Sequence, residues 1–142
     1  MATKLVANAA ITINAPAARV WRALVTPAEI KQYMFGTEVT SEFTEGSRIT
    51  WKGEWQGKAY EDKGVIKSFK PQQRLQYTHF SPLAGLPDNP ENYHTVTIEL
   101  AAIGDTTRVR LSQDGNATET AREHSQKNWT NMLTALKGLV EG

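Results

Sequence analysis

The chain has 142 residues, a formal net charge of +1, 39% hydrophobic and 22% charged residues, and no cysteine. This length fits a single domain, 1–142, that can bury roughly 70% of the surface exposed by its unfolded chain. Disulfides, thiol chemistry and thiolate metal sites are excluded, and the scattered Lys and Arg residues lack the basic stripe that nucleic-acid binding needs.

In chain order, the hydrophobic pattern predicts one strand, two short helices and six further strands. Residues 4–14 alternate weakly and form the first strand. Pro16 and Pro27 lie where helices begin, because a proline in the first helical turn loses no hydrogen bond. From Gly36 onward the period is two, and the strands predicted are 37–43, 48–52, 60–69, 74–80, 93–101 and 107–112. Consecutive strands with short turns pair antiparallel, so we predict an α+β layer with its helices on one face of the sheet.

Residues 116–140 predict one long amphipathic helix with a 3.6-residue period. The face expected to pack on the core consists of Ala121, Ser125, Trp129, Met132, Leu136 and Leu139. Its C-terminal half is bulky, whereas its N-terminal half is small or polar, and such residues at core positions leave space or need partners. The helix therefore closes a cavity that is tight at one end and open at the other, or Ser125 and Asn128 bond to neighbouring backbone in a solid core.

No segment is suited to a membrane or to export. No apolar run approaches the roughly 18 residues that a membrane span requires. The first residues lack the apolar core of a signal peptide. We therefore expect a cytoplasmic protein without a membrane span.

Several short motifs resemble one family in their order and spacing. They are Ile13-Asn-Ala-Pro16 with Val20-Trp21, Thr26-Pro27, Phe43 to Gly46, Gly64 with Pro71 and Leu75, Leu86-Pro-Asp-Asn-Pro-Glu-Asn-Tyr-His-Thr-Val-Thr97, and Trp129. The chain resembles the START-like, or SRPBCC, superfamily over nearly its whole length, and more closely its single-domain subfamily named for activators of the 90-kDa heat-shock protein ATPase. The resemblance implies a helix-grip (START/Bet v-like) fold, in which a curved antiparallel sheet grips the long C-terminal helix and often leaves a cavity for an apolar molecule.

Two histidines, His79 and His94, flank the long segment 81–92 that connects neighbouring strands. If these strands pair, the alternation of side chains places both imidazoles near one cavity mouth. A metal site would need a third ligand, for which Glu91 is the nearest candidate in the sequence, and we expect no metal and no cofactor. Binding of a ligand's oxygen, or a pH-sensitive surface pair, is the expected alternative.

We predict no catalytic residue. Acid–base chemistry usually needs a carboxylate in an apolar pocket, and none of the positions assigned to the inner face carries one. Glu61 and Asp62 are expected at a solvated strand edge. Ser125 lacks the Gly-x-Ser-x-Gly elbow of a nucleophilic serine.

The leading hypothesis is non-catalytic binding of a small, mostly apolar molecule between the sheet and the N-terminal half of the last helix. Aromatic side chains supply a large apolar face with a polar handle, which suits a binding pocket. The predicted ligand-binding residues are Tyr33, Phe35, Trp51, Trp55, Tyr77, His79, His94, Ser125, Trp129 and Met132. One alternative is a protein-interaction module related to chaperone ATPase activators, with a protein partner or a second copy contacting Trp55 and segment 81–92. The other is a cyclase- or hydratase-type enzyme that uses His79 or His94 as its proton carrier.

Overall fold

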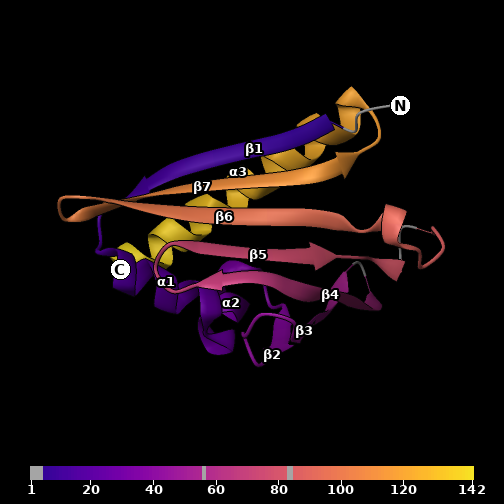
Figure 1. The fold of residues 1–142 in the computed structure, drawn as a ribbon, viewed down its shortest axis with the longest axis horizontal. Helices are drawn as coiled ribbons and strands as arrows, with labels where there is room; N and C mark the ends of the chain where they lie inside the picture. Colours follow the sequence, from indigo (N-terminus) through magenta and orange to yellow (C-terminus); the bar gives the residue numbers. More distant parts are fainter. Residues whose placement is uncertain (1–4, 56, 83–84) are drawn as a thin grey trace.

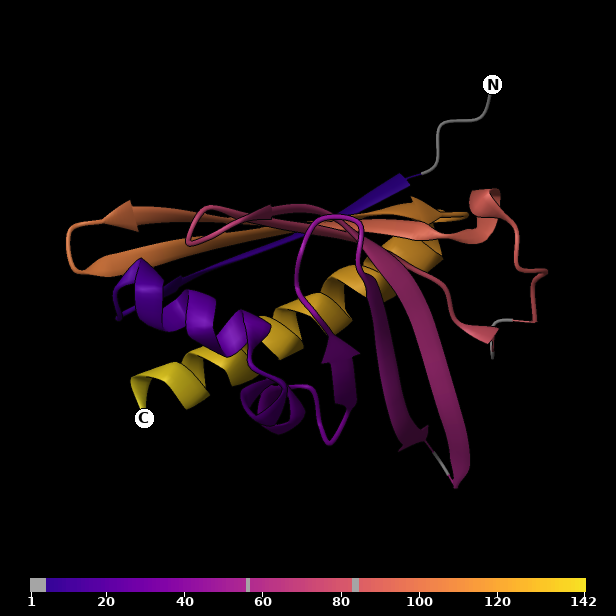
Figure 2. The same cartoon turned by 60° about the horizontal axis from the view of Figure 1, so that its bottom comes forward.

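The sheet of this protein has seven antiparallel strands in the order β1-β7-β6-β5-β4-β3-β2 (Figure 1). The computed structural model describes residues 5–55, 57–82 and 85–142. Its elements are β1 (Leu5–Ile13), α1 (Ala17–Val25), α2 (Pro27–Tyr33), β2 (Glu38–Ser41), β3 (Arg48–Trp55), β4 (Lys58–Lys70), β5 (Arg74–His79), the 3-10 helix η2 (Pro90–Asn92), β6 (His94–Ile103), β7 (Thr106–Asn116) and α3 (Glu119–Glu141). All three α-helices lie on the concave face, with α3 running across the strands (Figure 2). The predicted helix-grip fold is confirmed.

The core lies between α3, α1 and the inner face of the sheet. In the middle of β5 and β6 every second residue is buried, namely Leu75 and Tyr77, and Val96, Ile98 and Leu100, as the period of two predicts. The helix α3 buries Met132, Leu133 and Leu136 in its C-terminal half, whereas Ala121, Ser125 and Trp129 are only partly buried. The predicted difference between the two halves of this helix is therefore present.

The largest errors in the predicted boundaries lie at the ends of two strands. The strand predicted at 48–52 would leave Trp55 in the turn that follows, but β3 continues to Trp55, which pairs with Lys58 of β4. Asn116 was expected to begin the last helix, but it ends β7. The helix is capped by Thr118, whose side-chain oxygen accepts a hydrogen bond from the backbone N–H of Ala121 at 3.1 Å, as N-cap threonines do.

The strand β4 bends sharply and belongs to both halves of the sheet (Figure 2). A methyl group built on the buried Gly64 would lie 1.7 Å from the carbonyl oxygen of Thr78. Only a glycine allows β4 and β5 to approach so closely. Beside it, the N–H of Val65 donates to the hydroxyl of Thr78 at 3.0 Å instead of to the β5 backbone. This bend turns β3 and the first half of β4 toward α3.

Among the described residues, no helix is long and apolar enough to cross a lipid bilayer.

Candidate functional site

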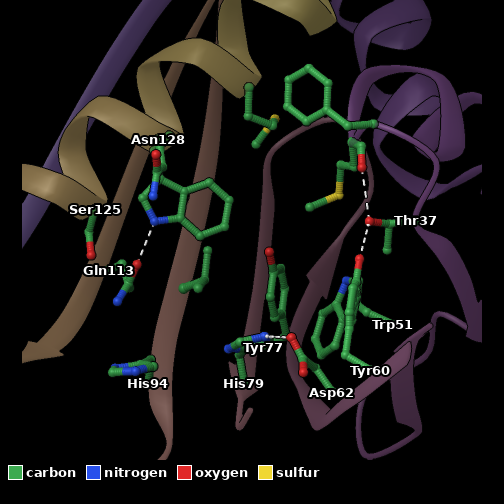
Figure 3. Close-up of a pocket in the computed structure, with 15 residues that line it drawn as sticks. Thr37, Trp51, Tyr60, Asp62, Tyr77, His79, His94, Gln113, Ser125 and Asn128 are labelled. Carbon is green, nitrogen blue, oxygen red and sulfur yellow. Dashed lines mark hydrogen bonds and ion pairs between the residues drawn. The ribbon is translucent and has the colours of Figure 1, made fainter. Parts of the chain in front are cut away.

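A pocket of about 370 Å³ lies between the N-terminal half of α3, the segment after α2 and the inner face of strands β3 to β7 (Figure 3). This volume is within the range of small-molecule sites. The residues that line it are Met34, Phe35, Thr37, Trp51, Tyr60, Asp62, Tyr77, His79, His94, Val96, Gln113, Ser125, Asn128, Trp129 and Met132.

Eight of the ten residues predicted for ligand binding line this pocket: Phe35, Trp51, Tyr77, His79, His94, Ser125, Trp129 and Met132. Tyr33 does not. It ends α2 with its side chain 3% exposed, facing a separate cavity of about 30 Å³, because Ile30 and Tyr33 share the buried side of that short helix. Trp55 ends β3, and its side chain lies outside the part of the chain that the structure describes.

One wall of the pocket is aromatic. The ring of Trp51 lies 5.2 Å from that of Tyr77 and 5.0 Å from the imidazole of His79, measured between centroids. Trp51 and Tyr77 are nearly fully buried, and burial raises the pKa of the Tyr77 phenol above its usual range. The hydroxyl of Tyr77 has no hydrogen-bond partner among the described residues, and Figure 3 shows it pointing into the pocket. Tyr77 is therefore a neutral donor available to a ligand.

An aspartate–histidine pair lines the pocket beside the aromatic wall. Nε2 of His79 lies 2.8 Å from Oδ2 of Asp62, and the side chains are 28% and 17% exposed. The other carboxylate oxygen of Asp62, Oδ1, is buried without a hydrogen-bond partner among the described residues.

We expected both Glu61 and Asp62 to lie at a solvated strand edge. This prediction is wrong for Asp62 and correct for Glu61. Asp62 stands opposite Trp51 in the β3–β4 register, so both side chains face inward. Glu61 faces out, where its carboxylate lies 3.9 Å from the ammonium group of Lys52. Counting back in steps of two from the inward Ile66 would have placed Asp62 on the inner face.

His94 stands opposite His79 in the β5–β6 register, as predicted. The two imidazoles are stacked, with centroids 6.3 Å apart and planes at 21°. Nδ1 of His94 donates to the backbone carbonyl of Asp114 at 3.1 Å. A methyl group on Gly115, whose φ is +79°, would lie 2.5 Å from this nitrogen. Glycine at 115 therefore leaves the space that the His94 ring occupies.

The polar half of α3 bonds to side chains of β7. The hydroxyl of Ser125 donates to Oδ1 of Asn116 at 2.8 Å, and the indole N–H of Trp129 donates to Oε1 of Gln113. The amide of Asn116 donates in turn to the carbonyls of Leu5 and Gln113. The expected solid core, with Ser125 bonded to neighbouring backbone, is therefore not the arrangement found: Ser125 bonds to a side chain beside an open pocket.

The comparisons with known proteins agree with this architecture. Residues 14–141 match the model of the family described as Activator of Hsp90 ATPase homolog 1-like protein. The chain belongs to this family. It matches none of the curated proteins with which it was compared.

Several solved structures have the same fold as this protein. Protein ChR145 from Cytophaga hutchinsonii is 56% identical, with a TM-score of 0.88 over 99% of this chain and 97% of that one. The Aha1 dimer from Colwellia psychrerythraea is 20% identical, with a TM-score of 0.74 over 96% of each chain. Ara h 8.0201 is 11% identical, with a TM-score of 0.76 over 96% of this chain and 97% of that one. The resemblance inferred from the sequence motifs is thus confirmed.

The mouth of the pocket carries an exposed aromatic residue. Phe35 follows α2 with 76% of its surface exposed and a φ of +57°, a left-handed conformation that bulky residues seldom adopt. Beside it, the hydroxyl of Thr37 lies 2.7 Å from that of Tyr60 and donates to the carbonyl of Met34 at 2.9 Å. Strain of this kind is typical of residues at ligand clamps.

The segment expected to contact a partner is tied to β4 rather than to the pocket. Asp88 forms an ion pair with Lys63 and accepts a hydrogen bond from the hydroxyl of Tyr93 at 2.6 Å. The ring of Tyr93 stacks on Phe80 with centroids 5.1 Å apart. No described residue of segment 81–92 lines the pocket.

Within the described part of the chain, no group of three or more His, Asp or Glu side chains could hold a metal ion.

Proposed function

We propose that the protein binds a small, mostly apolar molecule in the pocket between α3 and the sheet. The observation that carries this proposal is a volume of about 370 Å³ that is lined by several aromatic side chains and by a small number of polar ones. Family membership and fold support a ligand-binding or interaction module in general.

The hydrophobic effect is large enough to hold such a molecule. A ligand the size of an aromatic side chain buries about 200 Å² of apolar surface, which is worth about 5 kcal/mol. Association and ordering offset part of this gain. We therefore expect an apolar probe of this size, with no specific polar contact, to bind with a Kd in the submillimolar to millimolar range.

A pocket-filling variant with a matched control tests this proposal. Asn128 lines the pocket and is exposed, so Asn128→Trp fills space there. Lys127 is the next residue on α3 and is also exposed, so Lys127→Trp adds the same side chain outside the pocket.

We expect the neutral dye N-phenyl-1-naphthylamine to become fluorescent on binding the parent protein. Asn128→Trp should weaken binding at least tenfold, and Lys127→Trp by less than twofold. Equal binding by both variants, with unchanged melting, would place the dye elsewhere and contradict the proposal. Native mass spectrometry of the purified protein, followed by extraction, then identifies any molecule that accompanies it.

Self-association is a second candidate, supported by one comparison. The Colwellia structure is described as an Aha1 dimer. In this chain Leu5 and Val6 are exposed apolar residues at the start of β1, an edge strand of the sheet, and edge strands are open to pairing with another chain. Light scattering at increasing concentration tests this. A monomer at every concentration contradicts it, and Val6→Lys should dissociate a dimer formed through this edge.

A further inference from the structure

The hydrogen bonds of His79 and His94 determine which nitrogen of each neutral imidazole ring carries the proton. An ionised carboxylate can only accept a hydrogen bond, so in the 2.8 Å contact with Asp62 the proton lies on Nε2 of His79. A neutral His79 therefore presents Nδ1 as an acceptor. This nitrogen lies on the side of the ring away from Asp62, toward His94 (Figure 3).

His94 has the opposite arrangement. A backbone carbonyl can only accept, so in the contact with Asp114 the proton lies on Nδ1 of His94. The backbone N–H of Thr95 donates to the carboxylate of the same Asp114 at 2.6 Å, which holds the end of β7 against β6. The acceptor nitrogen of a neutral His94 is then Nε2, on the other side of its ring.

The hydrogen-bonding groups of Tyr77 and His79 complement a hydroxyl group. Tyr77 offers an O–H donor that no described residue takes up, and the Tyr77 ring lies next to Trp51, which in turn touches His79. His79 offers an acceptor. A hydroxyl is both a donor and an acceptor, so a ligand's hydroxyl can donate to His79 and retains an oxygen that can accept from a donor such as Tyr77.

The charges of the lining residues disfavour an anion. Among the described residues that line the pocket, Asp62 is the only carboxylate and there is no Lys or Arg. A carboxylate ligand would lose its hydration, find no permanent cation and meet the Asp62 charge. The same pocket leaves the apolar remainder of a ligand in contact with Trp51, Trp129 and Met132.

We propose that this pocket selects neutral phenols or alcohols on an apolar ring system and discriminates against the corresponding carboxylates. The inference rests on the proposed function, because it names the chemical class bound in the same pocket. The hydroxyl would lie beside His79, with Nδ1 of that ring as its acceptor.

Four probes with one ring system separate the contributions. Naphthalene tests the apolar pocket alone, 2-methoxynaphthalene adds an acceptor, 2-naphthol adds an acceptor and a donor, and 2-naphthoate adds an anion. Their affinities are measured at pH 8 by competition with N-phenyl-1-naphthylamine. We expect 2-naphthol to bind about tenfold more tightly than naphthalene or 2-methoxynaphthalene, the effect of one well-formed hydrogen bond, and 2-naphthoate to bind at least tenfold more weakly than 2-naphthol.

The variants are His79→Phe, which keeps a ring but removes the acceptor, and the isosteric Asp62→Asn, which removes the carboxylate that holds the proton on Nε2. Loss of such a carboxylate allows the wrong tautomer in other histidine sites. Both variants should lose the preference for 2-naphthol over 2-methoxynaphthalene, measured as the ratio of the two affinities within each variant. ¹⁵N NMR of the parent protein should show Nε2 protonated in His79 and Nδ1 protonated in His94.

The outcomes distinguish the two levels of the proposal. If naphthalene and the dye both fail to bind, the proposed function is wrong, and the inference falls with it. If naphthalene binds but 2-naphthol gains nothing, or 2-naphthoate binds more tightly, the pocket is real and the inference is wrong. A proton on Nδ1 of His79 in the parent protein likewise overturns it.

Discussion

Replacing Gly64 by alanine should destabilise the protein strongly, although the change adds one methyl group. The added Cβ would lie 1.7 Å from the carbonyl oxygen of Thr78, whereas essentially no Cβ approaches another heavy atom within 3.0 Å. The backbones of β4 and β5 would have to separate by more than about 1 Å. Overpacking of this kind costs about 1–3 kcal/mol, and loss of the hydrogen bond between Val65 and Thr78 adds about 1 kcal/mol. We expect a total loss of about 2–4 kcal/mol.

The matched control is the same substitution at Gly138. This residue lies on the exposed side of α3, and a Cβ there would meet nothing within 4 Å. Alanine in a helix interior is better than glycine by about 0.5–1 kcal/mol, so Gly138→Ala should stabilise the protein. Thermal and urea unfolding followed by circular dichroism measure both variants.

At about 3 °C per kcal/mol for a chain of this size, Gly64→Ala should melt roughly 6–12 °C below the parent and Gly138→Ala slightly above it. If the two alanine variants melt within about 2 °C of each other, the close approach of the strands at Gly64 is not present in solution.

Further variants test the site and the titrating groups. Trp129→Ala should cost about 2–3 kcal/mol, less than the roughly 3–5 kcal/mol of a fully buried tryptophan, because Trp129 is only partly buried; normal melting would contradict its packing. Phe35→Gly should relieve the backbone at φ +57° and leave melting unchanged or higher, while dye binding weakens; unchanged binding would remove Phe35 from the site. The pKa of Asp88 is lowered by hydrogen bonds from Lys63 and Tyr93, so its contribution to stability is present above the unfolded pKa of about 4 and is lost as pH falls through the lower folded value. In Asp88→Asn the free energy of unfolding should therefore fall less steeply as pH is lowered below about 4, and an unchanged pH dependence would refute this. Burial raises the pKa of Tyr77, so stability should fall as pH rises above about 10, and an absorbance titration should show this phenol ionising only as the protein unfolds.

Local patterns in the sequence were sufficient to predict the order of the elements and most of the pocket. The alternation of β5 and β6 placed His79 and His94 opposite each other, and the structure has that register. The small and polar N-terminal half of the last helix indicated where the pocket would lie, because burial of polar positions without partners is unfavourable.

The residues that were missed depend on partners far away in the chain. The run Ser-Gln-Asp-Gly-Asn at 112–116 has the composition of a turn, so β7 was predicted to stop at 112. In the structure the strand continues, because the side chains of Gln113 and Asn116 bond to Trp129 and Ser125 on α3. Asp62 was assigned to solvent because it lies near the expected start of a strand, and its partner, His79, lies seventeen residues later.

Two glycines connect the fold to the chemistry of the pocket. Gly64 admits the Thr78 carbonyl beside His79, and Gly115 admits the ring of His94. Each glycine thus makes room next to one of the two stacked imidazoles, on a different pair of strands. Glycine within a strand weakens it, since it loses more conformational freedom on folding and packs no side chain. Gly115→Ala should therefore displace His94 and reduce the preference for 2-naphthol, and an unchanged preference would show that the position of His94 does not matter for recognition.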